Sequence, residues 1–123
     1  MKVIKTETLH ADAGWRTLSF LKITTDEGIV GYSEYNESFG STGTTHAIEN
    51  MGPLIEGTDP LEYAVTSSRL YAMTRLARGG VNAQAIAAIE NALLDIKGKA
   101  LNVPVHELLG GKQRDTLPLY WSH

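Results

Sequence analysis

The fold is decided by residues 83–111, which read AQAIAAIENALLDIKGKALNVPVHELLGG. Apolar side chains recur in this stretch at steps of three and four residues, a period that places them on one face of an α-helix. The predicted face consists of Ile86, Ile89, Leu93, Ile96 and Ala100, widened by Ala85, Ala88 and Ala92. Small side chains let another element approach closely, so the stretch predicts a packing helix. Its spacing alone indicates no chemistry.

Signals for both ends of this helix are present. Asn82 is a suitable N-cap, and Asn102 can adopt the left-handed conformation that often follows a helix. Pro104 prevents continuation and suits the first turn of a short second helix, residues 105–109, which a Gly-Gly pair closes.

Three segments before this region predict strands. Residues 2–9 mix β-branched and charged side chains, and residues 17–24 place Leu18 and Phe20 on one side and Leu21 and Ile23 on the other. The sequence Thr-Asp-Glu-Gly at residues 25–28 is a hairpin signal, and residues 29–35 return as a third strand. The three segments predict an antiparallel meander.

Two helices are expected between the meander and the long helix. The first has Thr44 or Thr45 as its N-cap and runs irregularly towards Pro53, with Ile48 and Met51 facing inward. The second begins at Pro60 with Asp59 as its cap and runs to Gly79–Gly80. Its expected buried stripe consists of Leu61, Val65, Ala72 or Met73, and Leu76. Strands followed by helices indicate an α+β fold.

Composition narrows the function classes. The 123 residues fit one domain by size, and 11 basic against 14 acidic residues give a net charge of −3. The charges are scattered, with no basic stripe, so we expect no nucleic-acid partner. There is no cysteine, which excludes disulfides and thiolate metal sites in this chain. No signal peptide or membrane-spanning run is evident, so we expect a cytoplasmic protein without a membrane partner.

Residues 88–111 (AIENALLDIKGKALNVPVHELLGG) resemble the signature that ends the N-terminal capping domain of the enolase superfamily, in its mandelate racemase and muconate lactonizing branch. Residues 24–34 (TTDEGIVGYSE) and 53–60 (PLIEGTDP) match as well, in the family order. The resemblance implies an enolase N-terminal-like cap over residues 1–113. It also implies that residues 114–123 begin a (β/α) barrel, with a first strand starting in residues 117–122. A whole barrel needs at least about 200 residues, so we expect the cap of a longer enzyme.

For that longer enzyme, the resemblance implies abstraction of the proton α to a carboxylate. The family holds Mg²⁺ with three carboxylates from barrel strands and uses a Lys or His base, so we expect no catalytic residue and no metal ligand in this chain. The polar loop after the third strand favours a sugar-acid dehydratase. A racemase, epimerase or cycloisomerase remains an alternative, as does a non-catalytic interaction module. The expected partners are a small carboxylate substrate, the C-terminal barrel and, as a homo-oligomer, further copies.

Two loops are the candidate substrate-binding segments, because in this family the loops after the first and third strands cover the barrel mouth. They correspond to residues 10–16 and 36–45. Trp15 offers a flat apolar wall with one N–H donor, and Arg16 offers a planar fork for carboxylate or hydroxyl groups.

Three further residues complete the candidate site. Phe39 would form a second wall, Asn36 could hydrogen-bond a polyol, and His123 would point into the barrel mouth from the first barrel strand. The alternative for Trp15 and Phe39 is that each anchors its loop on the sheet.

The remaining charged and histidine residues receive structural interpretations. Glu90, Asp95 and Lys97 are expected on the exposed side of the long helix, where Asp95 can pair with Lys99. The histidines at positions 10, 46 and 106 have no metal-ligand spacing and are interpreted as surface or capping residues.

Overall fold

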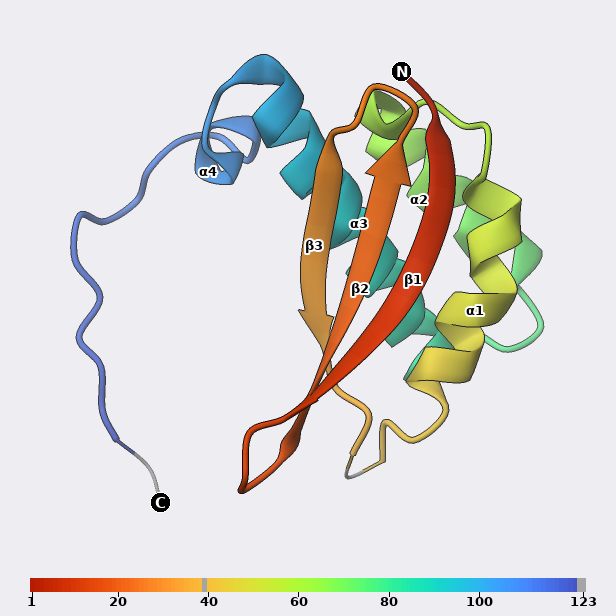
Figure 1. The fold of residues 1–123 in the computed structure, drawn as a ribbon, viewed down its shortest axis with the longest axis horizontal. Coiled ribbons are helices and arrows are strands. Elements are labelled where there is room, and N and C mark those ends of the chain that lie inside the picture. The colour runs from red at the N-terminus through yellow and green to blue at the C-terminus, as the bar shows by residue number, and fades with distance from the viewer. Residues whose placement is uncertain (39, 122–123) are drawn as a thin grey trace.

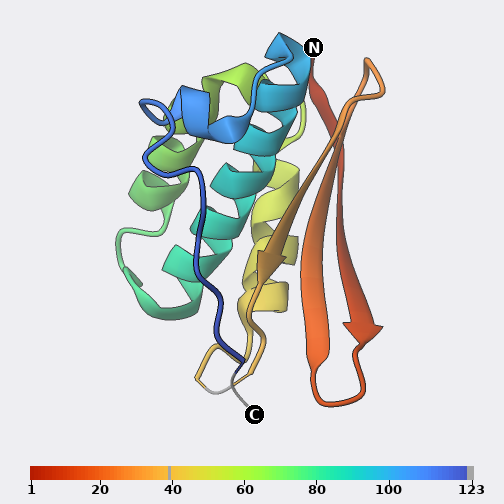
Figure 2. The ribbon, with the colours of Figure 1, turned by 90° about the vertical axis from the view of Figure 1, so that its left-hand side faces the viewer.

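A computed structural model describes residues 1–38 and 40–121 and shows a three-stranded antiparallel sheet with helices on one face (Figure 1). The strands, in the order β1-β2-β3, are β1 (Val3–Asp12), β2 (Thr17–Thr25) and β3 (Val30–Tyr35). The helices are α1 (Thr44–Ile55), the 3-10 turn η1 (Pro60–Glu62), α2 (Tyr63–Met73), α3 (Gly80–Leu101) and α4 (Val105–Leu108). Figure 2 shows the sheet and the helices as two layers. The predicted α+β meander is confirmed.

The core lies between the sheet and α3. Ile86, Ile89, Leu93 and Ile96 are fully buried, as the helical period predicts. Ala100 is exposed and Leu94 is buried, both contrary to the predicted face. The buried arc is broader than a single stripe because α3 also packs against α1, α2 and η1.

The two faces of β2 follow the predicted alternation. Leu21 and Ile23 are fully buried, whereas Leu18 and Phe20 are only half-buried. The sheet therefore buries one face under the helices and leaves the other partly exposed to solvent.

The predicted end of the first strand is wrong. β1 continues to Asp12 because its pairing with β2 extends to the Ala11–Leu18 and Asp12–Thr17 pairs. The predicted loop of residues 10–16 shrinks to a turn, in which Asp12 Oδ1 accepts a 2.8 Å hydrogen bond from Gly14 N. The hairpin of β1 and β2 extends past the end of β3, because its pairing continues beyond Ser19, the last residue of β2 that pairs with β3 (Figure 1).

The predicted buried stripe of the second helix is also wrong. Val65 is 63% exposed and Leu76 is 94% exposed, while α2 buries Thr66, Ser67 and Leu70. This face packs against α3, with Leu70 in the core and the small hydroxyl-bearing side chains of Thr66 and Ser67 beside it. The helix ends at Met73, six residues earlier than Gly79, with Thr74 N donating to Leu70 O at 3.0 Å.

One end of α3 matches its prediction and the other does not. Asn102 has φ 54° and donates its backbone N–H to Lys99 O at 3.2 Å, as a left-handed cap should. Asn82 is not the N-cap, because α3 begins at Gly80 after Gly79. The Asn82 side chain instead donates to Ala77 O at 2.9 Å and fastens the preceding loop.

The predicted Asp95–Lys99 pair forms at 2.7 Å and also satisfies the open edge of β3. Asp95 Oδ2 accepts a 2.8 Å hydrogen bond from Tyr32 N, and Lys99 Nζ donates to Val30 O at 2.7 Å. These main-chain groups belong to the edge of β3 that no other strand covers in the described part of the chain. The pair therefore protects an edge that could otherwise join a foreign strand.

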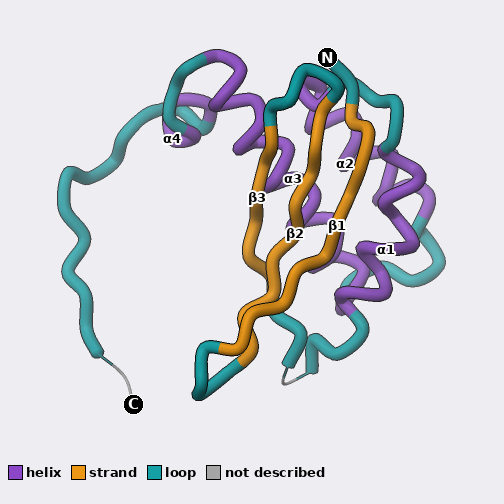
Figure 3. Tube along the Cα trace, in the orientation of Figure 1, coloured by secondary structure: helices purple, strands orange, loops and turns teal. Residues whose placement is uncertain are grey.

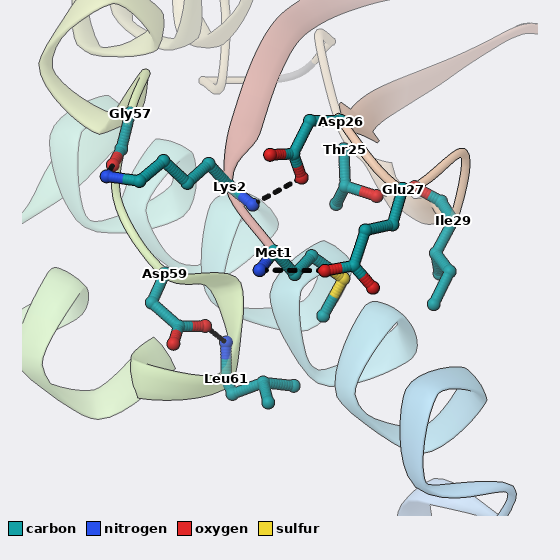
Figure 4. A network of polar contacts seen from close by, with 9 residues as sticks. All are labelled: Met1, Lys2, Thr25, Asp26, Glu27, Ile29, Gly57, Asp59 and Leu61. Atoms are coloured by element: carbon teal, nitrogen blue, oxygen red, sulfur yellow. Dashed lines mark hydrogen bonds and ion pairs between the residues drawn. The ribbon is translucent and has the colours of Figure 1, made fainter.

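The start of the chain is tied to the turn between β2 and β3 (Figure 4). The Met1 amino group lies 2.8 Å from Glu27 Oε1, and Lys2 N donates to Asp26 Oδ1 at 2.7 Å. The hydrogen bond to Glu27 raises the pKa of the amino group above its usual 8.0. Its contribution to stability is therefore present below pH 8 and is lost as the pH rises through the higher value. In the same region Asp59 Oδ1 accepts from Leu61 N at 2.9 Å, which confirms the predicted cap.

Gly31 marks the closest approach of β3 to α3. A methyl group there would overlap Ala92 O and would lie 2.6 Å from Ile96 Cγ1. In an ordinary strand, Gly→Ala stabilises by about 0.4–1 kcal/mol through the unfolded chain. Here we expect Gly31→Ala to destabilise the domain by about 1–3 kcal/mol, the usual cost of overpacking.

Urea unfolding of the Gly31→Ala variant measures this effect, with Glu34→Ala on the same strand as the control because Glu34 is exposed. Equal midpoints for Gly31→Ala and the wild type would contradict the close packing of β3 on α3.

After α4 the chain continues as an extended segment. Residues 112–121 form neither helix nor strand (Figure 3). The side chains of Leu117, Leu119, Tyr120 and Trp121 are exposed. The predicted start of a strand in residues 117–122 is not formed in the described part, residues 117–121. Among the helices that the structure describes, none has the length and apolar character needed to cross a membrane.

Candidate functional site

The structure brings the two predicted loop regions together at one end of the sheet. Ser19 of β2 pairs with Tyr35 at the end of β3, so residues 36–38 leave β3 beside the β1–β2 hairpin. A pocket of about 460 Å³ opens between them. Its lining consists of His10, Trp15, Arg16, Thr17, Ser19, Glu37 and Ser38.

Trp15 and Arg16 form one side of this pocket as a stacked pair. The guanidinium carbon of Arg16 lies 4.6 Å from the centre of the Trp15 ring, and Arg16 Nη2 lies 3.3 Å from Glu34 Oε1. Trp15 is 78% exposed, so it does not anchor the hairpin on the sheet. The stacking presents an apolar wall and a cation on the same surface, with Glu34 balancing the charge.

Asn36 uses its side chain within its own segment. Its Oδ1 accepts from Ser38 N at 3.1 Å and from Ser38 Oγ at 3.0 Å, and its Nδ2 donates to Ser38 O and Ser41 Oγ. This arrangement shapes the chain as it leaves β3. A direct contact of Asn36 with substrate stays a prediction. The other two predicted site residues, Phe39 and His123, lie outside the described residues.

His10 lines the pocket, although the sequence indicated only a surface or capping residue. The extension of β1 places it opposite Ser19, with a 3.1 Å hydrogen bond between His10 Nδ1 and Ser19 Oγ. Its ring meets Tyr35 edge-on at a centroid distance of 6.4 Å. Continuing the alternation of strand residues past Leu9 would have placed His10 on this face.

Glu37 also lines the pocket; it lies in the predicted loop of residues 36–45, but the sequence did not single it out. Its carboxylate accepts hydrogen bonds from Gly43 N at 2.7 Å, Thr45 N at 2.6 Å and Thr45 Oγ1 at 2.7 Å. Burial acts to raise the pKa of Glu37, but these three hydrogen bonds outweigh it and hold the pKa below its usual 4.5. No sequence motif links a glutamate to amides six and eight residues later.

The site can bind and orient a polar molecule, but its donor set does not fit a magnesium ion. Within residues 1–38 and 40–121, no three His, Asp or Glu side chains lie close enough together to hold a metal. The carboxylates beside the pocket are already engaged, Glu34 by Arg16 and Glu37 by main-chain amides. The described residues therefore supply walls and hydrogen-bonding groups.

Comparison with known proteins identifies a matching family. The family model of the mandelate racemase / muconate lactonizing enzyme, N-terminal domain, matches residues 6–110 of this sequence. The matched range covers the sheet from within β1 and every helix that the structure describes.

Individual relatives agree with this match. D-galactonate dehydratase from Xanthomonas axonopodis pv. citri is 39% identical over 120 residues, which are 98% of this chain and 31% of the relative. A crystal structure of a proposed L-alanine-DL-glutamate epimerase from Burkholderia xenovorans, bound to magnesium and fumarate, is 55% identical with a TM-score of 0.94. The match covers 99% of this chain and 30% of the chain of the epimerase. The crystal structure of the 3,6-anhydro-D-galactonate cycloisomerase from Zobellia galactanivorans is 33% identical with a TM-score of 0.82. This match covers 92% of this chain and 33% of the chain of the cycloisomerase. The chain thus spans about a third of the length of its relatives.

Proposed function

This chain belongs to the family of mandelate racemase and muconate lactonizing enzyme N-terminal domains, and from that membership we propose that it caps a longer enolase-superfamily enzyme. The resemblance recognised in residues 24–34, 53–60 and 88–111 is confirmed by the family match. The observation that carries the proposal is the pocket between the β1–β2 hairpin and residues 37–38, on a domain with this family's fold.

We propose that the longer enzyme is a dehydratase of a sugar acid. The Xanthomonas relative, which is 39% identical over 98% of this chain, is named a D-galactonate dehydratase. A pocket lined by a serine pair, a threonine, a histidine and an arginine suits a substrate with several hydroxyl groups. The reaction would remove the proton α to the carboxylate and expel a hydroxyl group from the neighbouring carbon as water.

The division of labour follows from the residues present. Magnesium, when bound, would stabilise the negative charge that develops on the substrate carboxylate. Because the described residues offer no ligand set for it, we assign the metal ligands and the base to the barrel. In this chain Trp15 would exclude water, and Arg16 would orient the distal hydroxyl groups of the substrate.

We further propose that residues 1–113 form the cap and that residues 114–123 begin the barrel domain. The exposed apolar side chains of Leu117, Leu119 and Trp121 suit a strand that pairs with other barrel strands. Sugar-acid metabolism is consistent with our assignment of the enzyme to the cytoplasm, and we expect it to be a homo-oligomer.

An epimerase or cycloisomerase is the second candidate, favoured by the names of two solved structures. The Burkholderia structure has 55% identity and the Zobellia structure 33%. The dehydratase and these alternatives share the same cap fold. The choice among them therefore depends on which barrel residue takes the proton and which returns it.

The test compares the 123-residue chain with the longer enzyme. We expect the chain alone to catalyse no exchange of the α-proton of any sugar acid, even with Mg²⁺, because the base belongs to the barrel. Proton NMR in deuterated buffer measures this exchange over a panel of sugar acids. Turnover by the chain alone, free of the longer enzyme, would contradict the assignment. For the longer enzyme, a product that keeps its hydroxyl group would favour the epimerase.

A further inference from the structure

The N-terminus of α1 receives its capping group from outside the helix. Gly43, the residue before the helix, has φ 101° and no side chain to cap it, and the first turn contains no acidic residue. The first amides of a helix need acceptors, and a negative charge near them is favourable. The Glu37 carboxylate supplies both through Gly43 N and Thr45 N.

A second contact joins this carboxylate to the core. Thr45 Oγ1 donates its one proton to Glu37 Oε2, so in the 2.9 Å hydrogen bond between the Tyr35 and Thr45 hydroxyls, Tyr35 is the donor. The Tyr35 side chain is buried in the core, and His10 packs edge-on against it. The network therefore connects β1, β3 and α1 at the pocket.

We propose that Glu37 is a positioning residue that fixes one wall of the substrate pocket. Its carboxylate fastens residue 37 to the start of α1, and Glu37 and Ser38 are themselves the part of the lining that faces the hairpin. We call the bonds from Glu37 to Gly43 and Thr45 the Glu37 clamp. The kinetic part of this inference rests on the proposed function, whereas the clamp itself does not.

The charge of Glu37 makes the clamp sensitive to pH. The charge of His10 on β1 acts on Glu37, Tyr35 on β3 is affected by both Glu37 and Glu49 of α1, and Arg16 of the hairpin lines the same pocket. Glu37 has a lowered pKa in the folded state, so its contribution is complete above the usual 4.5. It is lost as the pH falls through the lowered value.

The clamp is tested by an NMR titration of the amide protons of the 123-residue chain. We expect Gly43 and Thr45 to shift together with one apparent pKa below 4.5. In Glu37→Gln this shared step should disappear, while in Glu49→Gln it should remain. Glu49 is the matched control because it lies on α1 and accepts one 3.2 Å bond from Thr8. Independent titration of the two amides, or a step that survives in Glu37→Gln, would overturn the clamp.

The positioning role is tested by kinetics of the longer enzyme. A displaced wall weakens substrate binding without touching the base, so Glu37→Gln should raise KM about tenfold with kcat within about threefold. Glu49→Gln should change neither. A lowered kcat at unchanged KM, or unchanged values for both, would overturn the role. A wild-type enzyme that uses no sugar acid overturns the proposed function instead, and the amide titration still decides for or against the clamp.

Discussion

Replacing Ile89 with Asp is expected to unfold the domain. Ile89 is fully buried in the core between α3 and the sheet, in a cluster that includes Ile86, Leu93 and Ile23. None of these neighbours can pair with a carboxylate. Burying a polar group without a partner costs about 2–7 kcal/mol, and an unpaired charge costs more. A small domain has only about 5–15 kcal/mol of stability in total.

Circular dichroism over a thermal scan provides the measurement. The Ile89→Asp variant should show no cooperative transition, whereas Ala87→Asp should melt close to the wild type. Ala87 is the matched control because it lies two residues away on the same helix with an exposed side chain. A cooperative melt of Ile89→Asp at the wild-type temperature would mean that this face of α3 is not the core.

The second large effect is expected from Trp15→Ala in the longer enzyme. Trp15 is exposed in this domain and stacks on Arg16, so its removal takes away a wall of the pocket and the support of the guanidinium. Losing both the wall and the alignment should lower kcat/KM by about 2–4 kcal/mol, roughly thirty- to a thousandfold. The affinity for Mg²⁺ without substrate should hardly change, because neither Trp15 nor Arg16 can be a ligand.

Steady-state kinetics over a panel of sugar acids and a Mg²⁺ titration should be measured on the same Trp15→Ala variant. Tyr71→Ala is a suitable control, since Tyr71 is an exposed aromatic residue on α2. An unchanged substrate profile together with a collapse of Mg²⁺ affinity would contradict the assignment. It would show that Trp15 stabilises the barrel and does not position the substrate.

The sequence by itself determined the features that arise from local periodicity. The three- and four-residue steps of Ile86, Ile89, Leu93 and Ile96 identified the buried face of α3. The alternation in β2 separated Leu21 and Ile23 from the opposite face, and the structure showed that theirs is the buried one. These predictions held because the helical and strand periods fix which side chains share a face, whatever the element later packs against. The three family motifs predicted the fold and the family, because they occur in the family order and are spread over most of the chain.

The tertiary structure alone decided what depends on partners distant in sequence. The face of α2 was assigned wrongly because helical spacing grouped Val65 with Leu76, whereas the helix ends at Met73 and buries Thr66, Ser67 and Leu70. Tyr32 N donates to Asp95, and Val30 O accepts from Lys99, only because β3 lies beside α3.

The candidate site divides in the same way. Trp15 and Arg16 could be named from the sequence because they stand in a loop whose place the family motifs fix. His10 and Glu37 join them in the pocket through pairing between β1 and β2 and through amides six and eight residues away. Such contacts follow from the path of the chain in space, and no periodic pattern of residues records that path.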